Sequence, residues 1–209
     1  QSFNDFFIRK FRPGVRKFDS QSLIIHAPCE GRYMAYQENS LKNIFPVKGQ
    51  NVTAEGLLLN NKWHDSFKDG PIVICRLAPV DYHRFHYPVA GEAIDQYEKG
   101  GRLFSVNPIC LKNTPDVFLR NHRRISILNS DKFGKIAYIE VGAFCVGKIV
   151  QTHKYKTFNS GDEKGYFLFG GSTVVMLGEK GKWRPDQDIC EQTQKGFETF
   201  IELGQQIAR

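Results

Sequence analysis

Two short segments of this 209-residue chain carry the side chains best suited to chemistry. The first places Asp81, His83 and His86 close together and ends at Pro88. Histidine titrates near neutral pH, so an imidazole can both accept and donate a proton. On a regular strand Asp81 and His83 would share one face and His86 would lie on the other, but the flanking prolines favour a bend. The segment predicts either acid–base catalysis or an ordinary polar surface.

The second segment is a glycine–serine turn that precedes an apolar run. Gly170 and Gly171 are followed by Ser172, Thr173 and Val174. Two glycines permit positive φ and add no bulk beside the serine hydroxyl. That hydroxyl could then attack the carbonyl carbon of Gly171, although a plain structural turn has the same pattern. The chain has neither the Gly-x-Ser-x-Gly elbow of hydrolases nor a phosphate-binding loop, which leaves those chemistries without an anchor.

Strands are the main elements available to position these two segments. Runs rich in β-branched and aromatic residues, separated by glycine and asparagine, predict strands at Leu23–Ala27, Gly31–Tyr36, Ile72–Leu77, Ile125–Leu128, Ile136–Val141, Phe144–Thr152 and Ser172–Leu177. A short helix or turn is expected at Lys112–Asn121, and helical spacing extends from Asp188 to Ile207 across two glycines. We predict one α+β, mainly β domain over residues 1–209. It would have packed antiparallel sheets, a short N-terminal amphipathic helix and a C-terminal helical tail.

Residues 1–20 combine phenylalanines with basic side chains. If Ser2 caps a helix, an apolar face forms with basic groups beside it, and the membrane-contact candidates are Phe3, Phe6, Phe7, Arg9 and Lys10. Such a helix can lie in a bilayer interface, or it can dock its phenylalanines on its own core. The net charge of +7 suits an anionic membrane surface. No recognised nucleic-acid-binding motif accompanies the basic residues, so we expect no nucleic-acid partner.

The five cysteines are scattered without a Cys-x-x-Cys pair. This argues against a disulfide framework and a zinc site, and favours a reducing compartment. No third ligand lies at metal-binding spacing from the two histidines, so we expect no metal. The apolar runs are too short to cross a bilayer. We therefore expect a peripheral membrane protein on the cytoplasmic side, or a cytoplasmic one.

Taken together and in this order, the two segments resemble those of the phosphatidylserine decarboxylase family. Its members carry a D-Y-H-R-x-H-x-P segment and, much later, a G-S-T or G-S-S motif, which Asp81–Pro88 and Gly171–Thr173 match. The similarity continues over most of the chain, at Ser2–Phe7, Phe104–Pro108, Val141–Gly147, Gly161–Gly165 and Lys195–Thr199. The chain is identified as a member, and its spacing is most similar to the short bacterial form.

The resemblance implies a proenzyme that cuts itself between Gly171 and Ser172. Residues 1–171 would become the β chain, and residues 172–209 the α chain with a pyruvoyl group made from Ser172. That group would form a Schiff base with phosphatidylserine and release CO₂ to give phosphatidylethanolamine, without pyridoxal phosphate or metal. The resemblance assigns His86 to self-cleavage and His83 to decarboxylation, with Asp81 orienting His83. It also suggests a homodimer.

One departure concerns the acidic residue expected to hold His86. The family usually has P-x-D-G, whereas this chain has Glu30 before Gly31. Glutamate keeps the charge and could still hold the imidazole. Cys29-Glu30 is also similar to the matching stretch of pyruvoyl-dependent amino-acid decarboxylases, so a free amino acid, including an aromatic one, is the alternative substrate. A further alternative is an uncleaved, inactive lipid-binding relative.

Overall fold

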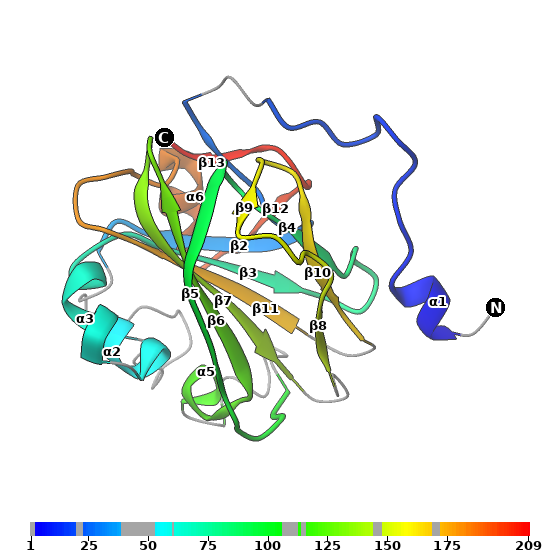
Figure 1. The fold of residues 1–209 in the computed structure, drawn as a ribbon, viewed down its shortest axis with the longest axis horizontal. Coiled ribbons are helices and arrows are strands. Elements are labelled where there is room, and N and C mark those ends of the chain that lie inside the picture. The colour runs from blue at the N-terminus through cyan, green and yellow to red at the C-terminus, as the bar shows by residue number, and fades with distance from the viewer. Residues whose placement is uncertain are drawn as a thin grey trace.

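An eight-stranded antiparallel sheet forms the centre of the protein (Figure 1), here described from a computed structural model. The structure describes residues 3–19, 23–38, 53–59, 61–105, 113, 116–143, 148–168 and 172–209. Its strands are β1 (Ile25–His26), β2 (Gly31–Tyr36), β3 (Ile72–Leu77), β4 (Arg84–His86), β5 (Gly91–Lys99), β6 (Arg123–Ser130), β7 (Gly134–Gly142), β8 (Ile149–Gln151), β9 (Thr157–Phe158), β10 (Glu163–Phe167), β11 (Ser172–Gly178), β12 (Thr199–Ile201) and β13 (Gln206–Ala208). The helices are α1 (Phe3–Phe7), α2 (Ala54–Leu58), α3 (Asn61–Phe67), α5 (Val117–Arg120) and α6 (Gln187–Gln194).

The strand order of the large sheet is β12-β2-β3-β11-β7-β6-β5-β9. Two smaller sheets accompany it, β4-β10-β8 and β1-β13. The expected mainly β, α+β architecture of antiparallel sheets is confirmed. The central strand β11 is buried at every position because both of its faces are covered, which explains its near-continuous apolar sequence.

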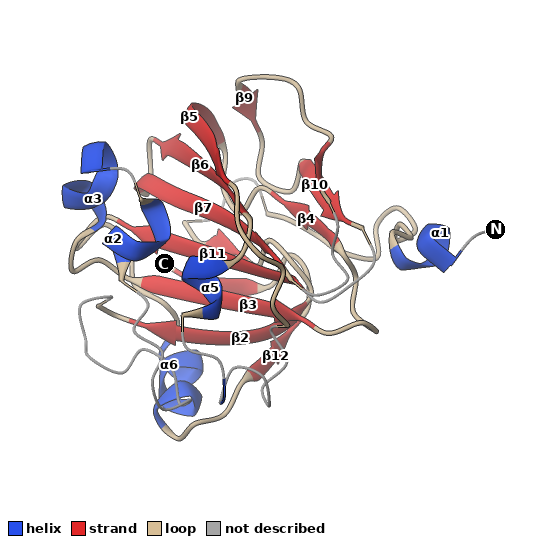
Figure 2. Cartoon of the chain, turned by 90° about the horizontal axis from the view of Figure 1, so that it is seen from below, coloured by secondary structure: helices blue, strands red, loops and turns tan. Residues whose placement is uncertain are grey.

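The two faces of the large sheet bury different layers. Helices α2, α3 and α5 cover one face (Figure 2), where Leu57, Phe67 and Phe118 pack on alternate residues of the strands. The other face carries Val174 and Met176 and packs against the smaller sheets and α6. Side chains alternate between faces along a strand, so Ser172 lies on the same face as Val174 and Met176. The candidate site therefore belongs to the layer that holds the smaller sheets.

The C-terminal tail is less helical than its spacing predicts. Helix α6 ends at Gln194, and Gly196 then adopts φ +84°, a left-handed conformation that ends helices. The chain continues as β12, turns again at Gly204 with φ +86°, and finishes as β13. The two glycines therefore divide the tail into a helix and two strands rather than interrupting one helix.

Candidate active site

Three neighbouring strands bring the glycine–serine turn and the histidine segment together. In β11 the first residue, Ser172, pairs with Leu77 of β3 on one side and with Gly142 of β7 on the other. Leu77 is the last residue of β3, and the chain runs from it directly into the segment that holds Asp81 and His83. The histidine segment therefore begins at the end of β3 that lies next to Ser172.

Ser172 is fully buried, and its hydroxyl has no hydrogen-bond partner among the described residues. A buried polar group is usually paired, so an unpaired one calls for an explanation, and a catalytic role is one such explanation. Gly142, directly opposite, has no side chain to crowd the hydroxyl. Gly171, the other half of the expected cleavage site, lies outside the described residues. The observed environment suits a serine whose oxygen reacts instead of holding a structural bond.

The carboxylate of Asp81 is engaged by groups other than His83. It accepts a 2.7 Å bond from Arg32 Nη1 and a 2.6 Å bond from the backbone N–H of Ala78. His83 Nδ1 instead lies 3.0 Å from the backbone carbonyl oxygen of Asp81. A carbonyl only accepts, so Nδ1 carries the proton and Nε2 is the basic nitrogen. Asp81 contacts His83 through its main chain, and its side chain fixes the turn.

The buried ring of His83 stacks on Phe7 of α1. The ring centroids are 3.8 Å apart with an interplanar angle of 30°, and Phe7 is only 1% exposed. The expectation that Phe7 contacts a membrane is therefore corrected: this ring docks on the candidate site. Phe6, its neighbour, is 61% exposed, and the side chain of Phe3 lies outside the described part of the structure.

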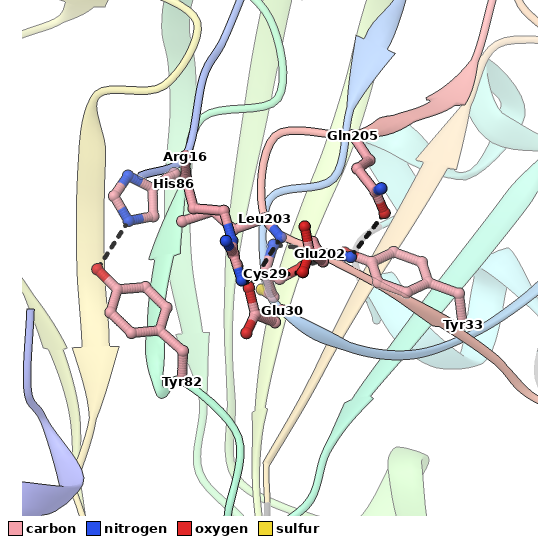
Figure 3. A network of polar contacts seen from close by, with 9 residues as sticks. All are labelled: Arg16, Cys29, Glu30, Tyr33, Tyr82, His86, Glu202, Leu203 and Gln205. Carbon is pink, nitrogen blue, oxygen red and sulfur yellow. Dashed lines mark hydrogen bonds and ion pairs between the residues drawn. The ribbon is translucent and has the colours of Figure 1, made fainter. Parts of the chain in front are cut away.

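Both ring nitrogens of His86 are held in place, and their hydrogen-bond partners among the described residues are a backbone carbonyl and a tyrosine hydroxyl rather than an acid. Nδ1 donates to the carbonyl oxygen of Gly161 at 2.8 Å, and Nε2 lies 3.3 Å from the Tyr82 hydroxyl (Figure 3). Burial raises the pKa of Tyr82, so its hydroxyl keeps the proton that it donates. Burial also lowers the pKa of His86, an effect that the bond to Gly161 opposes. His86 is thereby kept as a neutral base.

Glu30, the expected partner of His86, forms an ion pair with Arg16 instead. Its Oε2 accepts a 2.7 Å bond from Arg16 Nε and a 3.3 Å bond from the backbone N–H of Leu203. No hydrogen bond or ion pair joins Glu30 to His86 within the described part of the chain. The physical reason is competition, because Arg16 takes the carboxylate while the Gly161 carbonyl takes the imidazole proton.

A cavity of about 240 Å³ opens beside His86. Tyr82 and His86 form part of its wall, to which Lys10, Arg12 and Arg16 contribute positive charge and Glu163 contributes negative charge. Phe11 stacks on Tyr82 with centroids 4.3 Å apart, so the N-terminal segment forms the outer side of this cavity. Lys10 pairs with Glu163 and Arg16 pairs with Glu30, so the cavity presents charges of both signs beside a neutral imidazole.

Sequence reasoning missed several residues that shape the site. Tyr82 lies inside the histidine segment, and its position next to two histidines was an available signal. Gly161 and Arg16 come from distant parts of the chain, and no local pattern connects either to His86 or Glu30. Arg32 was likewise unmarked, because a single arginine in a predicted strand is commonplace.

The comparison with known proteins agrees with the motifs. The profile of the family described as phosphatidylserine decarboxylase matches residues 3–209. The chain belongs to the phosphatidylserine decarboxylase family. It is 43% identical over 208 residues to a "Phosphatidylserine decarboxylase proenzyme" of Clostridium novyi. The matched region covers 99% of this chain and 70% of that relative. A proenzyme of the same name from Fusobacterium nucleatum is 43% identical over 207 residues, covering 99% of this chain and 69% of the relative.

Proposed function

We propose that the chain is the proenzyme of a phosphatidylserine decarboxylase that activates itself by cleavage between Gly171 and Ser172. The observation that carries this proposal is the buried hydroxyl of Ser172 at the start of β11, which has no hydrogen-bond partner among the described residues and lies beside the histidine segment. Family membership supports the substrate, since the similar relatives are named as proenzymes of this activity. Pyruvoyl dependence is general in the family, and Ser172 fits its precursor.

The cleavage needs an acyl shift, an elimination and a hydrolysis. Ser172 Oγ attacks the Gly171 carbonyl carbon and gives its proton to a base, which passes a proton to the nitrogen as the C–N bond breaks, leaving an ester and a free amine. Removal of the Cα proton of residue 172 then breaks the Cβ–Oγ bond and releases a carboxylate on Gly171. Water displaces the nitrogen as ammonia and leaves the pyruvoyl group. We assign the base to His86, whose unprotonated Nε2 can take the proton once the Tyr82 hydroxyl moves aside or relays it.

In the mature enzyme, the pyruvoyl carbonyl would capture the substrate amine and accept the electrons left when CO₂ departs. We assign the transfer of a proton during decarboxylation to His83. Its Nδ1–H is held by the Asp81 carbonyl, so Nε2 is the ring nitrogen that gains and gives up the transferred proton. Arg32 balances the charge of the Asp81 carboxylate. Phe7 covers one face of the His83 ring and excludes water from it.

We further propose that an anionic bilayer is the partner surface, on the cytoplasmic side. Within the described part of the chain, no helix has the length and apolar character needed to cross a bilayer. Phe6 and Val80 are exposed apolar residues, and Arg9 contacts both of them. Its guanidinium lies 4.9 Å from the centroid of the Phe6 ring and donates a 2.9 Å hydrogen bond to the backbone carbonyl of Val80. Apolar side chains beside a guanidinium suit the headgroup region. Lys10, 3.7 Å from Glu163, adds positive charge.

The decisive experiment compares the wild-type chain with Ser172→Ala. The wild type should yield two pieces, 1–171 and 172–209, on a denaturing gel and release CO₂ from phosphatidylserine vesicles, whereas Ser172→Ala should stay intact and inactive. Mass spectrometry of the shorter piece should show a pyruvoyl N-terminus. An intact wild-type chain would instead support an inactive lipid-binding relative. Turnover of free amino acids alone would support the other decarboxylase class, which Glu30 favours.

Vesicle binding tests the membrane assignment separately. Phe6→Ser combined with Arg9→Gln should lower binding to phosphatidylserine vesicles several-fold, because it removes an inserted ring and about 1 kcal/mol of surface attraction per basic residue. Leu59→Ser is a matched control, since Leu59 is also an exposed apolar residue but lies beside α2. Equal binding by both variants would contradict the assignment.

A further inference from the structure

Lys164 of β10 and Glu140 of β7 form an ion pair in the protein interior. Both side chains are fully buried, and Lys164 Nζ donates to Glu140 Oε1. Lys164 also donates to Gln151 Oε1 at 2.8 Å, and its Nζ lies 5.2 Å from the ring centroid of Tyr138. Removing two charges from water costs several kcal/mol per ion, and apolar residues in the same space are often equally stable. Stability alone therefore does not account for this pair.

A β-bulge turns Lys164 inward. Glu163 of β10 is opposite His86 of β4, while Gly165 is opposite Phe85, so two steps along β10 match one step along β4. Bulges redirect side chains and are frequent next to active sites. The bulged residue is Lys164 itself, and it lies directly across from the strand that carries His86.

The pair lies on the same sheet face as the Ser172 hydroxyl. Glu140 is opposite Val174, and Gly142 is opposite Ser172, so Glu140 and Ser172 are diagonal neighbours on one face. Gly142 places no side chain between them. Glu140 Oε2, like Ser172 Oγ, is buried and has no hydrogen-bond partner among the described residues.

The pair also connects the strands on the two sides of the cleavage position. Strand β10 ends at Phe167, shortly before the expected cleavage position, whereas β7 is hydrogen-bonded to β11 from Ser172 onward. An ion pair in a low-dielectric interior is strong and directional, which plain apolar packing is not. It can fix how far β10 slides along β7, and therefore where the chain after β10 meets Ser172.

We propose that Lys164 and Glu140 are positioning residues for self-cleavage, which hold β10 in the one placement from which the chain leads correctly to Ser172. This inference rests on the proposed self-cleavage. Neither residue needs to touch the reacting atoms, because both act through the strands that carry them. The burial that lowers the pKa of Lys164 is opposed by Glu140, which fits a pair that works only when both charges are present.

The test follows cleavage and folding together in freshly synthesised chains. Glu140→Leu with Lys164→Met removes both charges and keeps apolar volume, so it should unfold near the wild-type temperature yet cleave at least about tenfold more slowly, as small misplacements do. Lys135→Met is the matched control, since Lys135 pairs with Glu179 at the opposite end of β7 and β11. It should cleave at the wild-type rate.

A second variant covers the case in which the double variant does not fold. Glu140→Gln keeps the shape and the bond from Lys164 but removes the negative charge, and it too should cleave more slowly while remaining folded by circular dichroism. Wild-type cleavage rates in the folded double variant, or in Glu140→Gln, would overturn the positioning role. Failure of the wild-type chain itself to cleave would instead overturn the proposed function, and this inference with it.

Discussion

His86 illustrates how a base can be prepared without an acidic partner. The Gly161 carbonyl holds the proton on Nδ1, and the Tyr82 hydroxyl marks Nε2 as the acceptor. A backbone carbonyl fixes the tautomer without adding negative charge, so it opposes only weakly the effect of burial on the imidazole. His86 should therefore remain neutral below the pH at which an ordinary histidine is protonated.

This arrangement predicts the pH dependence of self-cleavage. Because burial lowers the pKa of His86, the cleavage rate should stay constant through about pH 6.5 and fall only at lower pH. The same shift means that the unfolded chain takes up the proton more readily, so stability is lost as pH falls below about 6.5. Gel assays of fresh chain across this range measure the rate. His64→Gln, a change in a surface histidine, should leave the profile unchanged; a midpoint above the ordinary value would refute the assignment.

For single residues, the sequence indicated which side chains could be catalytic but not which groups they bond to. The histidines, Asp81 and Ser172 could be selected because their chemistry is local to short motifs. The partner of Glu30 could not, because Arg16 reaches it from residues 1–20, which the sequence predicts to be a membrane-interface segment. The partner of His86 is a main-chain carbonyl, which no residue type reveals.

The N-terminal segment is the element whose role differs most from expectation. The end of helix α1 and the residues that follow it place one aromatic ring beside each of three side chains of the histidine segment. Phe7 stacks on His83, Phe11 stacks on Tyr82, and Phe18 lies tilted 6.0 Å from His86. The segment thus covers the candidate site while leaving Phe6 exposed.

Truncating Phe7 should loosen this cover. Phe7→Ala removes a buried ring and should lower the free energy of unfolding by up to about 3–5 kcal/mol, whereas Phe7→Leu, which keeps most of the volume, should cost less than about 1.5 kcal/mol. Chemical denaturation measures both. Phe6→Ala is the control and should change stability by less than about 0.5 kcal/mol, because that ring is exposed. Equal effects of Phe6→Ala and Phe7→Ala would contradict the docking.

The elements that the sequence predicted well are those buried on both faces. Strand β3 matches its predicted limits because apolar, β-branched residues fill most of it, and β2 matches because Tyr33, Met34 and Ala35 form its buried apolar part. Strand β5 was missed, since its sequence includes Glu92, Asp95 and Glu98 and its side chains are only partly covered. The tail was misjudged because the spacing of its apolar residues fits a helix, while Gly196 and Gly204 take left-handed turns that the spacing does not encode.

At the scale of the whole molecule, the position of β11 decides what cleavage does. This strand lies in the large sheet between β3 and β7, both of which precede the proposed cut between Gly171 and Ser172. Residues 172–209 also supply α6, β12 and β13, each packed on or paired with an earlier part of the chain. Residues 172–209 are therefore an integral part of the sheets and do not form a separate appendage.

The two pieces should therefore remain together after cleavage. Val174, Val175, Met176 and Leu177 are almost completely buried, and each such side chain contributes roughly 1.5–3 kcal/mol of apolar burial. Size-exclusion chromatography of cleaved protein should give one peak that contains both pieces, which separate only in denaturant. Elution of the short piece by itself under native conditions would contradict this placement of β11.

The position of β11 also makes the refolding of mature protein depend on protein concentration. Before the cut, a chain that unfolds has its own central strand tethered nearby and can rebuild the sheet alone. After the cut, the strand must be recaptured from solution, so refolding becomes second order and fails at high dilution. The working lifetime of each molecule is then set by how rarely its sheet opens.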